Sequence, residues 1–250
     1  MTVVYRQAGV TELSLDLFLA GAGDHPAMVF FHGLGAATDQ FWPQARAFRA
    51  QGYVTASVDY RIGPAFPGPV ADAKAAVRWL RARSREYGID PKRVTAVGGS
   101  FGGHLAAMLA ATPGMWEEGE NLDQDSTVGA VILLNPGLDL ADAGPSVRPA
   151  VAEFVKAYLG GTPEEAPSTY RVASAFTYVK ATLPPTLLLH GTDDQTVTYA
   201  QAVAYRDALK AAGGIVELFT AEGAGHAFFN HEPWLTRTLA AMQDFAKTYG

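Results

Sequence analysis

Short apolar runs alternate with longer amphipathic stretches along most of the chain, and this alternation constrains the fold more than any other feature. Residues 27–31 and 128–134 are apolar throughout, as expected for strands that are covered on both faces. Between two such runs, residues 69–87 carry apolar side chains at helical spacing. Parallel strands need crossover connections of this kind. The alternation therefore predicts an α/β fold with a mostly parallel sheet and helices on both faces.

Two segments depart from this pattern. Residues 13–19 alternate apolar and polar side chains, which predicts a half-buried, antiparallel strand at the edge of the sheet. Residues 137–185 are the least regular part of the chain and are where a small lid or specificity element would lie. Because no repeat or linker interrupts the sequence, we expect residues 1–250 to form a single domain.

Composition excludes several classes of partner and site. The net charge is −6 at pH 7, and the clustered cations that nucleic acid binding requires are absent. The chain has no cysteine, which excludes disulfides and cysteine nucleophiles. No apolar run is long enough to span a membrane, and the amino terminus lacks a basic segment followed by an apolar core. We therefore expect a cytoplasmic protein with no membrane partner, although a removed signal peptide would leave no trace and secretion stays open.

The turn around Ser100 is the first candidate for chemistry. Residues 98–103 read Gly-Gly-Ser-Phe-Gly-Gly and lie between an apolar run and a helix-like segment. This strand, turn and helix order is typical of the G-x-S-x-G turn, which lifts a serine hydroxyl above a sheet. Glycine at 98 and 102 lets neighbouring backbone come close. The helix that follows directs free N–H groups toward the serine, where an oxyanion would form.

Two later strand ends carry the other side chains that a serine nucleophile needs. Asp193 and Asp194 follow the apolar run 186–190, and His226 follows the last strand. A serine hydroxyl is a poor nucleophile until a neutral imidazole takes its proton, and the imidazole needs a carboxylate to fix its tautomer. Because ligands bind at the carboxyl ends of strands in such sheets, the order Ser, Asp, His predicts a triad. From the residues alone, either aspartate could be its acid.

Together these motifs resemble the α/β-hydrolase superfamily over nearly the full length of the chain. Within it, the chain is most similar to the hormone-sensitive-lipase-like and feruloyl-esterase-like carboxylesterases, including the microbial group called BD-FAE. The resemblance rests on the turn around Ser100 and on the segments His32-Gly33-Leu34-Gly35, Asp59-Tyr60-Arg61, 72–80, 87–94, His190-Gly191-Thr192-Asp193-Asp194 and Gly225-His226.

The resemblance implies a fold and a reaction. It implies the α/β-hydrolase fold, with about eight strands and no large N-terminal cap, and a serine carboxylesterase that needs no cofactor. It assigns Ser100 as nucleophile, His226 as base and Asp194 as acid. It also places the oxyanion hole at the amide of Phe101 with one or two amides of the His-Gly loop, those of Leu34 and Gly35. Which of them is the second donor stays open, because this loop reads His-Gly-Leu-Gly rather than the His-Gly-Gly-Gly of lipase-like relatives.

The substrate class is less constrained than the reaction. We expect small-molecule or sugar-linked esters with short acyl or aryl groups. An amidase, a peptidase, a carbohydrate deacetylase and a non-catalytic binding protein on the same scaffold are the alternatives. We expect Phe101, Phe228 and Trp42 to contact substrate. Because few residues precede His32, we also expect an open site. Nothing in the sequence distinguishes a monomer from a dimer.

Polar residues outside the triad have structural interpretations. The histidine spacing does not fit a metal site, so we expect no bound metal, and His104 and His190 are interpreted as structural. Asp59 and Arg61 are expected to form an ion pair near the site. The acidic segment 117–125 is interpreted as a solvated surface, with a calcium site as the alternative.

Overall fold

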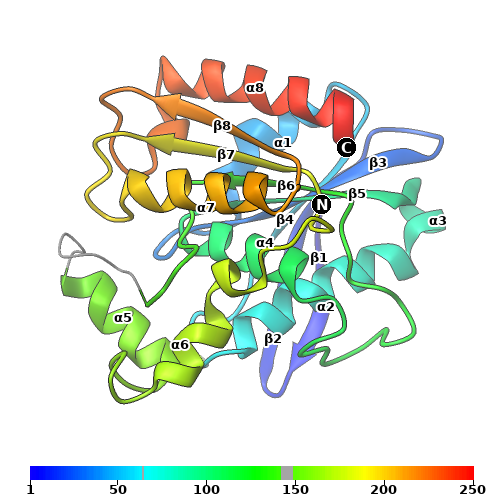
Figure 1. Ribbon diagram of the computed structural model, residues 1–250. Helices are drawn as coiled ribbons and strands as arrows, with labels where there is room; N and C mark the ends of the chain where they lie inside the picture. Colours follow the sequence, from blue (N-terminus) through cyan, green and yellow to red (C-terminus); the bar gives the residue numbers. More distant parts are fainter. Residues whose placement is uncertain (64, 142–148) are drawn as a thin grey trace.

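A computed structural model describes residues 1–63, 65–141 and 149–250 and contains an eight-stranded sheet with the strand order β1-β2-β4-β3-β5-β6-β7-β8 (Figure 1). The strands are β1 (Thr2–Ala8), β2 (Thr11–Phe18), β3 (His25–Phe31), β4 (Val54–Val58), β5 (Ile89–Gly99), β6 (Ala130–Leu134), β7 (Thr186–Gly191) and β8 (Val216–Ala221). From β4 to β8 every neighbouring pair is parallel, whereas β1 pairs antiparallel with β2, and β2 with β4.

Helices cover both faces of this sheet. They are α1 (Trp42–Arg49), α2 (Gly68–Ala82), α3 (Ser84–Tyr87), α4 (Phe101–Ala111), α5 (Pro149–Leu159), α6 (Pro167–Ala173), α7 (Tyr199–Ala211) and α8 (Trp234–Tyr249), with short 3-10 turns η1 (Thr38–Phe41), η2 (Ala175–Tyr178) and η3 (Phe228–Asn230). Apolar side chains of α2, α4 and α7 pack in one core, and those of α1 and α8 pack in another. Figure 1 shows α7 and α8 on opposite sides of β7 and β8.

The predicted α/β-hydrolase fold is confirmed, and two of its elements differ from expectation. The expected edge strand at 13–19 is β2, but it is not the outermost, because β1 pairs with it from Thr2 to Ala8. The two strands are joined at Gly9, whose φ of 64° suits a tight turn. The helix expected at 69–87 ends at Ala82, and α3 is a separate short helix.

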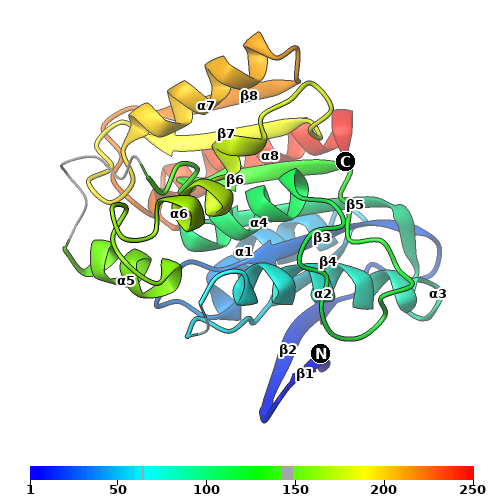
Figure 2. The ribbon, with the colours of Figure 1, turned by 60° about the horizontal axis from the view of Figure 1, so that its bottom comes forward.

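The described part of the irregular segment 137–185 contains the helices α5 and α6 and the 3-10 turn η2. We call α5 and α6 together the cap segment, since they lie between β6 and β7 in sequence and stand away from the sheet (Figures 1 and 2). Residues 142–148 of the irregular segment lie outside the described residues. Of the helices that the structure describes, none has the length and apolar character needed to cross a membrane.

Candidate active site

Ser100 occupies a strained turn between β5 and α4. Its φ of 54° and ψ of −118° lie outside the regions that ordinary residues prefer. Two glycines make this turn possible: a Cβ at Gly98 would collide with the carbonyl of Gly102, and a Cβ at Gly102 would collide with the carbonyl of Phe31. The sequence therefore fixes Ser100 at the carboxyl end of β5, with its side chain next to the start of α4.

His226 and Asp194 complete a hydrogen-bonded row with this serine. The Ser100 Oγ lies 2.9 Å from Nε2 of His226, and Nδ1 of His226 lies 2.7 Å from Oδ2 of Asp194. With the imidazole proton on Nδ1, the ring donates to the carboxylate and accepts from the serine hydroxyl. Asp194 follows β7 and His226 follows β8, so three strand ends bring the predicted residues together. The neighbouring Asp193 is exposed.

The carboxylate of Asp194 is held in its charged form. Burial raises its pKa, but hydrogen bonds from His190 and His226 outweigh burial and leave the pKa well below its usual range. The other oxygen, Oδ1, accepts hydrogen bonds from the amides of Thr196 and Val197 at 2.8 and 3.0 Å. His190, interpreted as structural from the sequence, lies 3.3 Å from Oδ2 through its Nε2. The Asp194 carboxylate thus has two histidine neighbours, His190 and His226.

The loop after β3 lies against the serine. Gly33 has no side chain, and an added Cβ would lie 3.4 Å from that of Ser100. Its amide donates to Oε1 of Gln40 at 2.7 Å, and the Tyr60 hydroxyl donates to the carbonyl of His32. These bonds hold the loop in place. Leu34 lines the cavity that contains Ser100, whereas Gly35 is not among the lining residues.

A cavity of about 320 Å³ opens onto Ser100. One side is aromatic: Phe101 packs edge-on against Phe154 and Tyr158 of α5, with ring centroids 4.9 and 5.2 Å apart. His226 also lines the cavity. The expectation of an open site is therefore wrong in one respect, because α5 supplies a wall. The orientation of α5 over the site could not be predicted from the periodicity of its sequence.

Trp42 and Phe228 are not among the residues that line this cavity. The indole Nε1 of Trp42 donates to Asp16 at 3.1 Å, which directs the ring toward β2. Phe228 is buried and packs edge-on against Trp234 of α8 at 5.9 Å. Of the three aromatic candidates, only Phe101 lines the cavity, and the predicted substrate contacts of Trp42 and Phe228 stay predictions that this cavity does not support.

Sequence reasoning missed Asn135. It follows β6 directly, is fully buried, and has a φ of 39°. Its Nδ2 lies 3.5 Å from Nε2 of His226. Inspection of the residue after every strand would have found it, because the carboxyl ends of parallel strands meet at one edge of the sheet.

The acidic segment 117–125 is not simply a solvated surface. The Glu117 carboxylate pairs with Lys74 at 3.3 Å and also with Arg78, and both cations are buried. Nor do Asp59 and Arg61 pair with each other: the guanidinium of Arg61 lies 2.8 Å from Asp72. Among the described residues, no group of three or more His, Cys, Asp or Glu side chains is arranged to hold a metal ion.

Comparisons with known proteins agree with this architecture. Residues 15–209 match the model of the family described as BD-FAE. The esterase LipC of Mycobacterium tuberculosis is 30% identical over 216 residues, which cover 81% of this chain and 53% of LipC. LipQ of the same organism is 31% identical over 82% of this chain and 50% of its own length. The chain thus spans about half the length of the curated relatives it matches.

Solved structures match over more of their length. The propionate-bound Est2 of Thermogutta terrifontis, a thermophilic esterase, is 34% identical and superposes with a TM-score of 0.85 over 98% of this chain and 92% of that one. The same esterase phosphonylated by sarin is 32% identical, with a TM-score of 0.87.

Proposed function

This chain belongs to the BD-FAE family, and on that premise we propose that it is a serine carboxylesterase acting on small-molecule esters through an acyl-enzyme. The observation that carries the proposal is the row of hydrogen bonds from Ser100 through His226 to Asp194, at 2.9 and 2.7 Å. Such a row lets a neutral imidazole remove the serine proton as the oxygen attacks, while the carboxylate stabilises the imidazolium that forms.

Acylation follows from these positions. The Ser100 oxygen forms a bond to the ester carbonyl carbon, and its proton passes to Nε2 of His226. The carbonyl oxygen becomes an oxyanion, which the amide at the start of α4, that of Phe101, and the amide of Leu34 stabilise. We favour Leu34 over Gly35 because Leu34 lines the cavity. Loss of one such donor typically slows acyl transfer by about 10²–10³-fold.

The leaving alcohol then departs with the proton held by His226, and the acyl group remains on Ser100. Water enters, gives a proton to Nε2 of His226 and attacks the acyl carbon. The second tetrahedral intermediate collapses, the serine oxygen recovers its proton, and the carboxylic acid is released. Asp194 stays ionised throughout, in keeping with its lowered pKa. Each step uses only the substrate, water, these side chains and the amides of Phe101 and Leu34.

A fluorophosphonate probe tests this function, since it labels an activated serine. The organophosphate adducts of the Thermogutta esterase support the choice of probe. We expect wild-type protein to be labelled and Ser100→Ala to remain unlabelled. Hydrolysis of 4-nitrophenyl acetate, compared with the matched anilide, separates an esterase from an amidase. Acetylated sugars test a sugar-linked substrate. Equal labelling of Ser100→Ala, or faster cleavage of the anilide, would refute the proposal.

A further inference from the structure

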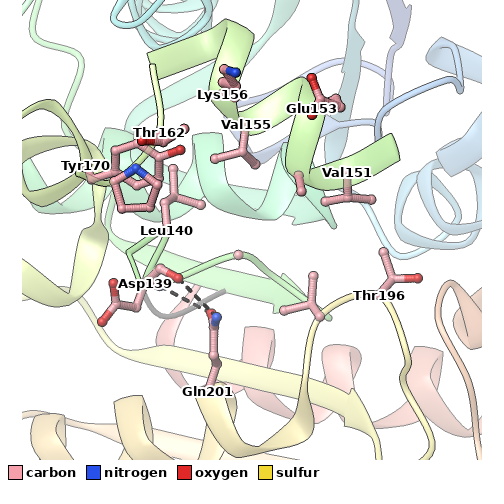
Figure 3. Close-up of a pocket in the computed structure, with 14 residues that line it drawn as sticks. Asp139, Leu140, Val151, Glu153, Val155, Lys156, Thr162, Tyr170, Thr196 and Gln201 are labelled. Carbon is pink, nitrogen blue, oxygen red and sulfur yellow. Dashed lines mark hydrogen bonds between the residues drawn. The ribbon is translucent and has the colours of Figure 1, made fainter. Parts of the chain in front are cut away.

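A second cavity, of about 260 Å³ (Figure 3), lies next to the one that contains Ser100. The two share the residues Gly137, Leu140, Val151, Val155, Thr196 and Val197. They are therefore two chambers of one cleft. We call the part beside Ser100 the inner chamber and the second cavity the outer chamber. Figure 3 shows α5 along one side of the outer chamber and Gln201 of α7 on the other.

Hydrogen bonds of Gln201 hold one side of the outer chamber in place. The Gln201 side chain accepts a hydrogen bond from the amide of Asp139 at 3.2 Å and donates to the Asp139 carbonyl at 3.0 Å (Figure 3). It also accepts one from the amide of Leu138 at 3.2 Å. The chamber thus has a fixed shape on the side of the sheet. The cap segment supplies Val155 and Tyr170 to its wall, and the exposed charged side chains of Glu153 and Lys156 line its edge. Its apolar walls suit an apolar ligand group.

The position of His226 decides which part of an ester reaches this chamber. In acylation the oxyanion faces the amides of Phe101 and Leu34, and the leaving oxygen must face Nε2 of His226 to receive its proton. The amides of Thr196 and Val197 hold the carboxylate that supports His226. Both residues also line the passage between the chambers. We therefore assign the leaving oxygen to the side of the inner chamber where Thr196 and Val197 lie.

We assign the acyl group to the aromatic part of the inner chamber, which Phe101, His104 and Phe154 line. Tyr158, itself buried, packs against this part, 5.2 Å from the Phe101 ring and with its hydroxyl 3.2 Å from Nε2 of His104. Because these rings are closely packed, we expect this part to accept a short acyl group better than a long one.

We infer that the outer chamber binds the alcohol moiety of the substrate, and that the substrates are esters of a short acid with a bulky, uncharged and mainly apolar alcohol. This inference rests on the proposed esterase function and specifies its substrate class. It also gives the cap segment a role: α5 provides one wall of both chambers and so sets the size of the alcohol.

Two ester series test the inference on the wild-type enzyme. Ethyl, butyl and hexyl acetate lengthen the alcohol at nearly constant leaving-group reactivity, and ethyl acetate, butyrate and hexanoate lengthen the acid. Each methylene that enters an apolar cavity is worth about fourfold in binding. We expect kcat/KM to rise by at least about tenfold from ethyl to hexyl acetate, and not to rise from ethyl acetate to ethyl hexanoate.

The reverse pattern, or no dependence on the alcohol, would overturn the inference while leaving the esterase function intact. Absence of hydrolysis of every ester would instead refute the esterase function itself.

A variant pair localises the effect. Ala152 lines the outer chamber but not the inner one, whereas Ala157, exposed on the same helix, lines neither. We expect Ala152→Trp to reduce the ratio of kcat/KM for hexyl over ethyl acetate by about tenfold, and Ala157→Trp to keep the wild-type ratio. An unchanged ratio in Ala152→Trp would overturn the assignment of the alcohol to the outer chamber.

Discussion

Asp194 reaches Nδ1 of His226 at 2.7 Å while the adjacent Asp193 is exposed to solvent. Replacing Asp194 by asparagine keeps its shape but removes the charge that stabilises the imidazolium. We expect kcat for an ester such as 4-nitrophenyl acetate to fall by about 10⁴-fold, as in other triads. The matched variant Asp193→Asn should retain wild-type kcat. Similar losses of kcat in the two variants would contradict the assignment of Asp194 as the acid of the triad.

His104 makes stability depend on pH. Burial lowers its pKa to about 4, whereas a histidine in the unfolded chain has a pKa of about 6.5. Between these two pH values His104 is protonated in the unfolded chain but stays neutral in the native protein. The free energy of unfolding therefore falls as the pH drops from 6.5 toward 4. Between pH 7 and pH 5 this amounts to about 2 kcal/mol in the free energy of unfolding.

Urea unfolding at the two pH values measures this loss, and His104→Gln provides the comparison. Glutamine does not titrate, so the variant should lose about 2 kcal/mol less than wild type over the same interval. If both proteins lose the same stability, His104 is not the group that titrates.

The close approach of Gly98 and Gly102 makes the turn intolerant of any side chain. In Gly98→Ala, the new Cβ would collide with the Gly102 carbonyl, and the strand and helix would have to separate. We expect the free energy of unfolding to fall by about 3 kcal/mol or more. In the control, Gly129→Ala, the nearest atoms are 3.8 Å away, and the change should stay within about 0.5 kcal/mol. A stable Gly98→Ala protein would contradict this packing.

The partly exposed carboxylate of Glu117 balances the positive charges of two buried side chains, Lys74 and Arg78. Removing its charge in Glu117→Gln leaves Lys74 and Arg78 without a carboxylate partner, although both keep backbone carbonyls as acceptors. We expect a loss of about 2–3 kcal/mol in unfolding free energy, because breaking a buried ion pair costs more than a surface pair contributes. Asp123→Asn changes an exposed acid of the same loop and should have no measurable effect in the same urea titration.

The fold was predictable from sequence because short, mainly apolar runs such as those at 27–31 and 130–134 alternate with segments of helical spacing. β1 escaped prediction because its residues, from Thr2 to Ala8, show no clean alternation and only Tyr5 and Arg6 are buried. The acidic segment 117–125 was misinterpreted for a related reason. Its partners Lys74 and Arg78 lie on α2, and nothing in a linear pattern reveals which charged helical positions face inward.

The rule that ligands bind at strand ends predicted Ser100, His226 and the pair Asp193 and Asp194, and the family resemblance selected Asp194 of that pair. The structure places Ser100, His226 and Asp194 within hydrogen-bond distance of one another. The residues that line the cavity could not be predicted from the same rule. Trp42 and Phe228 were chosen for their aromatic character, yet burial in the core satisfies such side chains equally well. Phe154 and Val155 lie on α5, whose placement over the site depends on tertiary packing and not on local periodicity.

The insertion of α5 between β6 and β7 has a consequence for how the chain can change over evolutionary time. Its side chains border the cleft, while the three proposed catalytic residues stand on other connections, after β5, β7 and β8. Mutations, insertions or deletions in the cap segment can therefore alter which alcohols are accepted without moving the reacting atoms. For protein engineering, this segment is the natural target for a library that seeks new substrates at constant chemistry.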